Sequence, residues 1–591
     1  MIRVGLRKLG LGILLFGMTV CCYTAAPVKA EASDVQINDT NFPDSAFQTY
    51  VRNVCDSNGD GELSQDEIEA VTSINMSKNF SEEKALNLKG IEHFTELQEL
   101  SCLGNKLTDL DMTGNSKLRI LNCDDNELTS LNLSNNPELT TLECDNNKLN
   151  TLDLSNNLEL TTLNCSTNWL ESLDVTNNKK LKTLKFSQNL IKNINLQKNT
   201  ELLDLECEGS WLTSLDVRQN TNLKRLYVYN NKQLTSLDVS NLENLTILRC
   251  YNNKLTSLDI SGSPVLTNLA CYQNQITELN LSQNKQLQKL SCENNQLTSL
   301  NVGKNPDLTE LNCSSNQLAS LSVSANEKLQ SLYISENQIT SLNVSKNPDL
   351  KNLECQNNQL TSLDVSANQK LRILKCSDNK ISALDLSQNS NLYPADWSFG
   401  VDNNPLIILK VPDNFTKATV PSSRVSLVDI VEINMAQLPG WDAESISDIT
   451  GAALKDGVLL FNPKATNVTY TYNCGYNCKL NVDIKIALNE YRIDYELDGG
   501  TNAAENPSTY LPVSVAIPLQ DPVKEGYTFD GWYKDAGFTL RITEIPKGHI
   551  GTMVLFAKWT KVSEPDPITP SPAPTNPATP SPIPTTPATS N

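Results

Sequence analysis

Leucines recur at fixed places through the middle of the chain, with polar residues between them. One stretch reads Leu139-Thr-Thr-Leu142-Glu-Cys144-Asp-Asn-Asn147-Lys-Leu149, and the same order returns 21 residues later. Fourteen such units, one of them 22 residues long, run from about Leu97 to Asn389. A short fixed period predicts a solenoid, because no unit buries its apolar face until it stacks on a neighbour.

Each unit predicts a short strand and a turn. The half L-x-x-L-x-C predicts a strand on the concave side, and a similar second half predicts an extended segment on the convex side with few helices. Two columns of asparagine mark the corners, where the side-chain amide can hydrogen-bond to backbone groups that have no partner in a β-ladder. The convex column that includes Asp111, Asp153 and Asp174 could suggest a cation ladder, but Asn and Ser322 interrupt it and favour a structural role.

The pattern L-x-x-L-x-C-x-x-N-x-L resembles that of the leucine-rich repeats. Further along, Tyr495–Asn502, Gly526–Tyr533 and Phe556–Trp559 resemble the internalin B-repeat, also called the Listeria–Bacteroides repeat. The layout as a whole resembles a bacterial, internalin-like surface protein. That resemblance implies a mainly β chain, with a β-grasp-like module after the solenoid and its cap.

Changes in composition divide the chain into six parts. We predict a signal peptide, a helical cap resembling an EF-hand, the repeat solenoid, a β-sandwich, the B-repeat module and a Pro/Thr/Ser-rich disordered tail. Their predicted boundaries are 1–30, 31–84, 85–391, 392–487, 488–560 and 561–591. The protein is thus expected outside the cytoplasm, secreted or associated with the cell surface, without a transmembrane segment and as a monomer.

The net charge of the chain bears on which classes of molecule it can bind. Cleavage after Ala30 would remove four of the 48 basic residues and none of the 68 acidic ones, which leaves a net charge of −24. Nucleic acid and anionic membranes demand a net basic face, so this charge argues against both as partners.

The cysteines follow the repeat. Eleven of the 16 occupy one column, where Phe186, Val228 and Ile334 replace cysteine in the remaining units. A column that accepts Phe, Val and Ile points inward, and we predict reduced cysteines in the core. Cys474 and Cys478 lie outside the column, and whether they form a disulfide stays open.

The loop between residues 56 and 67 fits the EF-hand pattern at every position. Calcium prefers oxygen ligands, and the loop offers only oxygens. A structural calcium ion is therefore predicted; the alternative is a cap that keeps the loop shape without metal, since Ser64 and Glu67 also form a capping box. The predicted ligands are Asp56, Asn58, Asp60, Glu62, Ser64 and Glu67.

No catalytic motif is evident, and the two histidines, His93 and His549, lie far apart in the sequence. We therefore predict a binding protein, not an enzyme. Positions 3, 5 and 7 of each unit face out of the strand, and in three adjacent units they carry four tyrosines and two arginines, a composition typical of binding hot spots. The predicted site for a protein or glycan ligand comprises Arg225, Tyr227, Tyr229, Arg249, Tyr251 and Tyr272.

Three hypotheses for the function of this cluster remain open. It could belong to an adhesin-like protein, to a carbohydrate-binding accessory factor whose tyrosines stack on sugars, or to a passive scaffold of the cell envelope. In the last case the tyrosines would form a self-packing ladder that only stabilises the sheet.

Overall fold

The computed structural model describes residues 34–77, 84–393, 398–415, 422–476, 478–513 and 515–563. The predicted signal peptide and almost all of the predicted tail lie outside these residues. The chain divides into two compact units, Met1–Leu329 and Gln330–Asn591, and each is described by itself.

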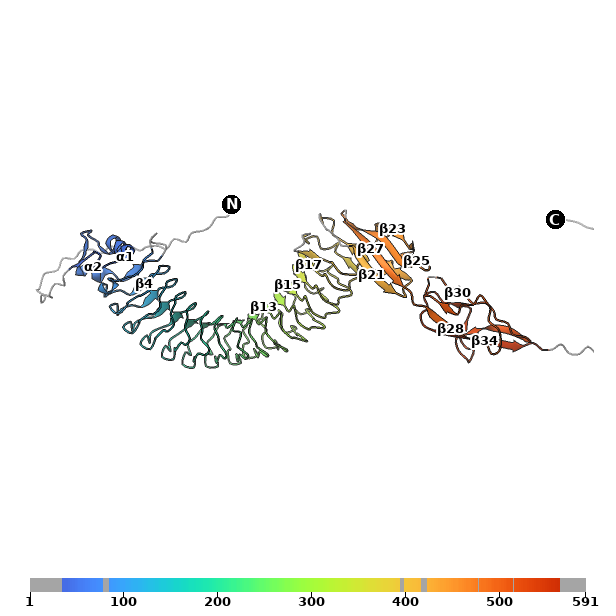
Figure 1. Ribbon diagram of the computed structural model, residues 1–591, viewed down its shortest axis with the longest axis horizontal. Coiled ribbons are helices and arrows are strands. Elements are labelled where there is room, and N and C mark those ends of the chain that lie inside the picture. Colours follow the sequence, from blue (N-terminus) through green and yellow to red (C-terminus); the bar gives the residue numbers. More distant parts are fainter. Residues whose placement is uncertain are drawn as a thin grey trace, which may run out of the picture. The chain divides into compact units, whose positions relative to one another are not determined.

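The first unit is built on a parallel sheet of three-residue strands. Each strand pairs with the next in register, so that Leu142 lies opposite Leu163 and Leu163 opposite Leu184. The strands line the inner side of the curve of this unit (Figure 1). They are β3 (Ser73–Asn75), β4 (Glu99–Ser101), β5 (Ile120–Asn122), β6 (Thr141–Glu143), β7 (Thr162–Asn164), β8 (Thr183–Lys185), β9 (Asp204–Glu206), β10 (Arg225–Tyr227), β11 (Ile247–Arg249), β12 (Asn268–Ala270), β13 (Lys289–Ser291) and β14 (Glu310–Asn312).

The core confirms the predicted inward columns. The apolar residue at the centre of each three-residue strand, such as Leu142, is buried, and so are all eleven cysteines of the column, each a free thiol. Phe186 and Val228, which replace cysteine, are buried equally. Burial raises the pKa of these thiols, to about 12 for Cys165, which fits their role as small apolar side chains.

The two asparagine columns hold the corners together. In the first column, Asn126 donates from Nδ2 to the carbonyls of Cys102 and Cys123 at 3.0 and 3.1 Å, and its Oδ1 accepts from the Leu107 N–H. In the second, Asn136 donates to the carbonyls of Met112 and Asn115. The convex side carries extended segments and isolated bridges, as predicted.

The aspartates of the convex column close local turns. Asp111 and Asp153 each accept a hydrogen bond from the N–H two residues ahead, at 3.0 and 2.9 Å. Hydrogen bonds from the hydroxyl and the N–H of Thr113 lower the pKa of Asp111, and those from the N–H and the hydroxyl of Ser155 lower the pKa of Asp153. The contacts agree with the structural role favoured for this column.

The cap precedes the sheet. It contains β1 (Val35–Gln36), α1 (Ser45–Tyr50) followed by a π-helical turn (Val51–Cys55), β2 (Glu62–Leu63) and α2 (Gln65–Ala70). The cap is helical, as predicted, and the capping box at the start of α2 is formed. The sheet begins earlier than predicted, because β3 lies within the range assigned to the cap.

The second unit begins with more strands of the same kind: β15 (Ser331–Tyr333), β16 (Asn352–Glu354) and β17 (Ile373–Lys375). β19 (Phe399–Gly400) pairs in parallel with β17, and β18 (Ala383–Asp385) with β20 (Ile408–Lys410). Asn404 donates to the Cys376 carbonyl at 2.8 Å, as the corner asparagines do. A further coil thus follows the predicted end at 391, hidden in the sequence by extra residues and by Val401 at the cysteine position.

Two small sheets follow, in the range where a β-sandwich was predicted. One contains β21 (Ser423–Val428), β27 (Cys478–Ala487), β26 (Asn467–Gly475) and β23 (Ile446–Thr450). The other contains β22 (Glu432–Asn434), β25 (Val458–Phe461) and β24 (Ala452–Lys455). Cys474 and Cys478 are buried here as free thiols, so no disulfide links them.

The C-terminal module is a five-stranded sheet around Trp532 and Leu555. Its strands are β28 (Tyr491–Glu496), β29 (Thr509–Tyr510), β31 (Tyr527–Tyr533), β32 (Arg541–Ile542) and β34 (Met553–Lys561), with β30 (Ile517–Pro518) and β33 (Glu544–Ile545) paired beside it.

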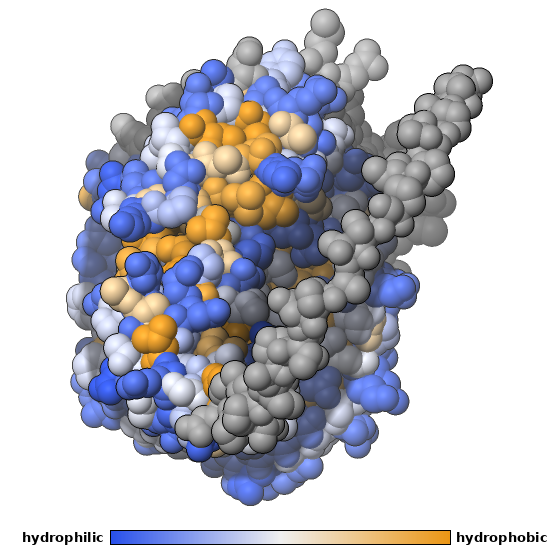
Figure 2. All heavy atoms as spheres, turned by 90° about the vertical axis from the view of Figure 1, so that its right-hand side faces the viewer, coloured by the Kyte–Doolittle hydropathy of each residue, from blue (hydrophilic) through white to orange (hydrophobic). Residues whose placement is uncertain are grey.

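Figure 2 shows apolar surface alternating with polar surface at one end of the molecule. Among the described residues, no helix has the length and apolar character needed to cross a membrane.

Candidate functional site

The structure brings all six predicted ligand-binding residues together on one face of the sheet. Arg225 and Tyr227 lie on β10, and Arg249 lies opposite Tyr227 on β11. Tyr229, Tyr251 and Tyr272 each follow the end of a strand by two residues, in three adjacent coils. We call these six residues the tyrosine–arginine cluster.

Three of the tyrosines stack on one another. The ring centroids of Tyr229 and Tyr251 are 4.2 Å apart, as are those of Tyr251 and Tyr272, with interplanar angles of 19° and 8°. Both faces of the Tyr251 ring are therefore covered by its neighbours. This geometry is the self-packing ladder considered from the sequence, and it leaves ring edges and hydroxyl groups to meet a ligand.

The phenols of Tyr229 and Tyr272, at the two ends of the ladder, remain hydrogen-bond donors at neutral pH. Burial raises the pKa of Tyr272 to about 12. The pKa of Tyr229 is raised further, by burial and by the neighbouring Glu208 carboxylate. A ligand at this face would thus meet neutral hydroxyl groups.

The two arginines are held differently. Arg225 forms a two-pronged ion pair with Asp204, with Nε 2.5 Å from Oδ1 and Nη2 2.6 Å from Oδ2. The guanidinium of Arg249 lies 5.1 Å from the centroid of the Tyr227 ring, and Arg249 is exposed. Arg249 is thus the cation of the cluster that is open to a partner, while Arg225 is already neutralised.

Glutamates stand at both ends of the ladder. Glu208 precedes Tyr229 in the same column and accepts a hydrogen bond from Asn230 Nδ2 at 3.2 Å. Glu293 follows Tyr272, and its Oε2 is buried without a hydrogen-bond partner. Burial raises the pKa of Glu293. Glu293 was not among the predicted site residues, although it is the next residue of the position-7 column after Tyr272.

The EF-hand-like loop is closed by its own hydrogen bonds. Glu67 Oε1 accepts from the N–H and the hydroxyl of Ser57, both at 2.7 Å, and Oε2 accepts from the N–H of Ser64 at 3.0 Å. These bonds, led by the one from Ser64, lower the pKa of Glu67 to about 2. Asp56 accepts from the N–H groups of Gly59 and Gly61.

This arrangement does not fit a calcium ion as it stands. Bidentate coordination would require Glu67 to turn both oxygens from N–H and O–H donors to the ion. Asn58 Nδ2 donates to Asp60, so these two side chains face each other. Among the described residues, no three acidic, histidine or cysteine side chains gather as a cation site. Calcium binding by Asp56, Asn58, Asp60, Glu62, Ser64 and Glu67 stays a prediction.

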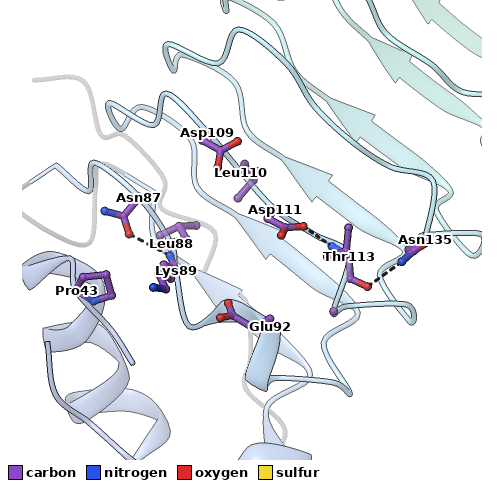
Figure 3. A pocket seen from close by; sticks show the side chains of 11 residues that line it. Pro43, Asn87, Leu88, Lys89, Glu92, Asp109, Leu110, Asp111, Thr113 and Asn135 are labelled. Carbon is purple, nitrogen blue, oxygen red and sulfur yellow. Dashed lines mark hydrogen bonds between the residues drawn. The ribbon is translucent and has the colours of Figure 1, made fainter. Parts of the chain in front are cut away.

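A hollow lies between the cap and the first coils (Figure 3). Several of its polar groups already have partners: Asp111 accepts from the Thr113 N–H, and Glu92 Oε2 accepts from the Gly90 N–H at 2.7 Å. Asn135 Nδ2 donates to the Thr113 carbonyl. These contacts tie the lining of the hollow to its own backbone.

The two histidines serve local packing. His93 lies 5.9 Å from the ring of Phe42, centroid to centroid. His549 Nδ1 is 2.5 Å from the hydroxyl of Tyr510, and burial lowers the pKa of its ring. Neither contact resembles a nucleophile and its base.

Comparison with known proteins supports the predicted architecture. Residues 491–558 match the Listeria-Bacteroides repeat domain family. The functional domain of InlJ from Listeria monocytogenes, described as including a cysteine ladder, is 27% identical over 77% of this chain and 99% of that one, with a TM-score of 0.62. The internalin InlF of the same species is 23% identical over 62% of this chain and 98% of that one, with a TM-score of 0.44.

A curated relative covers only a short part of the chain. A protein of Evansella cellulosilytica described as a Gly-rich membrane protein is 36% identical over 75 residues, which are 13% of this chain and 8% of that protein. The chain thus has an internalin-like leucine-rich-repeat architecture followed by a Listeria–Bacteroides repeat, as predicted. Such relatives are bacterial surface proteins, and their solenoids are binding folds.

Proposed function

We propose that this internalin-like protein is secreted or displayed at a bacterial cell surface, where it binds a protein ligand through the tyrosine–arginine cluster. One observation carries the proposal: the six residues of the cluster lie together on three adjacent coils, three on strands β10 and β11 and three just beyond the strand ends, with Arg249 exposed above Tyr227. Tyr and Arg dominate binding hot spots because they combine apolar area with hydrogen-bonding capacity.

The stacking geometry favours a protein over a sugar at this face. A sugar ring that stacks on an aromatic side chain needs a free ring face, and neighbours cover both faces of Tyr251 at 4.2 Å. Hydroxyl groups, a guanidinium and two flanking glutamates instead suit the mixed donors and acceptors of a polypeptide surface. The accessory factor that stacks sugars on these tyrosines is therefore the weaker candidate.

The passive envelope scaffold is the second candidate function. The ladder itself favours it, since stacked rings stabilise a sheet whether or not a ligand is present. A scaffold does not, however, require the exposed Arg249 over Tyr227. The two functions differ in whether any surface molecule is bound through the cluster.

The test is an array of bacterial and host surface proteins and glycans, probed with the secreted chain and with the Tyr227→Ala/Tyr251→Ala/Tyr272→Ala variant. Tyr333→Ala is a matched control, because Tyr333 occupies the same place on β15 that Tyr227 occupies on β10. We expect a protein partner whose binding the triple variant loses and the control retains. No partner, or equal binding by all three chains, would favour the scaffold.

A further inference from the structure

A second aromatic surface lies on another column of the solenoid. The position between the corner asparagine and the next leucine points outward in every unit, and eleven of the fourteen units place a charged or amide residue there. Three consecutive coils break this rule with Trp169, Leu190 and Trp211, which are 56%, 36% and 56% exposed. We call these residues the Trp–Leu–Trp stripe.

The backbone sets the stripe in line. The Trp169 N–H donates to the Leu149 carbonyl and the Leu190 N–H to the Leu170 carbonyl, each at 2.9 Å, so consecutive coils are joined at this column. Because neighbouring strands lie about 4.8 Å apart, the two indoles stand two coils, or about 10 Å, from each other. Leu190 fills the space between them in the same column.

The two indoles differ from the tyrosines of the ladder, whose rings stack on one another. Among the described residues, neither Trp169 nor Trp211 has an aromatic or cationic side chain against its ring. Large exposed apolar side chains in a contiguous row mark an interaction surface, since water contact with them is unfavourable. Their exposure leaves ring surface available for stacking.

The surroundings of the stripe are polar and carry little net charge. Lys148, next in the column, is paired with Glu127 at 2.8 Å. Glu171 and Lys192, one coil apart beside the stripe, have opposite signs, and Lys232 in the coil after Trp211 is an exposed cation. The other outward groups nearby are uncharged donors and acceptors, namely Thr167, Gln188, Ser172, Asn193, Thr213 and Ser214.

We propose that the Trp–Leu–Trp stripe binds a neutral, extended polysaccharide. The apolar face of a sugar ring stacks on an indole, and its hydroxyl groups exchange hydrogen bonds with amides and hydroxyls beside it. Sugar rings in an extended chain repeat at nearly the spacing of the coils, so a first and a third ring meet Trp169 and Trp211. Leu190 then lies beneath the ring between them.

Charge distinguishes this ligand from a bilayer. Aromatic and leucine side chains also enter lipid interfaces, but anionic membrane surfaces attract basic segments. The stripe has no basic cluster around it, since Lys232 is its one cation beyond the Lys148–Glu127 pair and the opposed Glu171 and Lys192, and the chain as a whole carries −20. The stripe is also independent of the tyrosine–arginine cluster, because it uses a different column of the solenoid.

The experiment measures retention of the full secreted chain on insoluble cellulose, chitin, curdlan and starch, and on phosphatidylcholine vesicles. At least one polysaccharide is expected to retain it, with tryptophan fluorescence changing on contact. The Trp169→Ala/Trp211→Ala variant should bind that polysaccharide at least about ten-fold more weakly, since each indole contributes of the order of a kcal/mol. The Trp169→Phe/Trp211→Phe variant keeps two flat rings and should keep most of the binding.

Two controls separate the outcomes. Leu158→Ala removes a side chain that is 53% exposed at a different corner of the coil, and it should bind as the parent does. Tyr251→Ala should also keep polysaccharide binding, so failure of the function proposed for the cluster would not affect this result. Retention by no polysaccharide, retention unchanged in the double alanine variant with native circular dichroism, or retention by vesicles alone would each overturn the proposal.

Discussion

Substitution of Asn168 tests how much the corner asparagines stabilise the solenoid. Only 4% of this residue is exposed. Its Nδ2 donates to the carbonyls of Cys144, Cys165 and Ser166 at 3.0, 3.2 and 2.9 Å, and its Oδ1 accepts from the Leu149 N–H at 3.0 Å. Asn168→Ala removes all four bonds and leaves a buried N–H without its acceptor.

The expected loss follows from these contacts. An unpartnered buried donor costs about 1–3 kcal/mol, and each lost hydrogen bond contributes about 0.5–1.5 kcal/mol net. The carbonyls have second lone pairs and suffer less, so we expect a loss of about 3–4 kcal/mol in local unfolding free energy. Asn178 is the matched control, because it is equally buried but donates only two bonds, to Leu154 and Asn157. Its Oδ1 has no partner, so Asn178→Ala should cost only about 1–2 kcal/mol.

Native-state hydrogen exchange is the suitable assay, since a solenoid unfolds locally and need not be two-state. In Asn168→Ala, the Leu149 amide should exchange about 100-fold faster or more, which corresponds to about 2.7 kcal/mol. In Asn178→Ala, the same amide should keep its protection. Unchanged protection of Leu149 in the first variant, or an equal loss in both variants, would refute this account of the corner.

Three further predictions concern the cap, the acidic face and the thiols. Glu67→Gln should lower the melting temperature in EDTA as well as in calcium, because Glu67 accepts hydrogen bonds from Ser57 and Ser64; a loss confined to calcium would instead support the predicted ion site. Burial raises the pKa of Asp124 to about 7, so the folded state binds more protons than the unfolded state between about pH 4 and 7, and stability falls as pH rises through that window. Asp124→Asn should therefore raise the melting temperature at pH 8 and not at pH 4; no difference between these pH values would contradict it. Iodoacetamide should leave the buried cysteines of the native protein unmodified and label them in urea; rapid labelling of the native chain, read by mass spectrometry, would show that the column is open.

The repeat made much of the architecture predictable. Its period implied parallel strands in register, and the replacement of cysteine by Phe186 and Val228 implied an inward column, which the buried free thiols confirm. The six residues of the tyrosine–arginine cluster could be placed on one face because stacked coils put equal positions side by side. The first strand of the solenoid sheet and the last coil were missed, since β3 follows the spacing with Val71, Ile74 and Met76 instead of leucines and cysteine, and Val401 follows an irregular insertion.

Only the tertiary structure decided how these side chains use their surfaces. Contacts between coils cover some ring faces and carboxylate oxygens and leave other groups, such as the indoles, exposed. These contacts depend on side-chain rotamers, which a sequence pattern does not specify. Hence the ladder of Tyr229, Tyr251 and Tyr272 has covered faces, and Glu67 turns to backbone N–H groups although its position matches a calcium ligand. The sequence by itself determined which residues share a column, because the period is set by the chain. Which ring faces and polar groups of an exposed column stay accessible depended on the packing of one coil against the next.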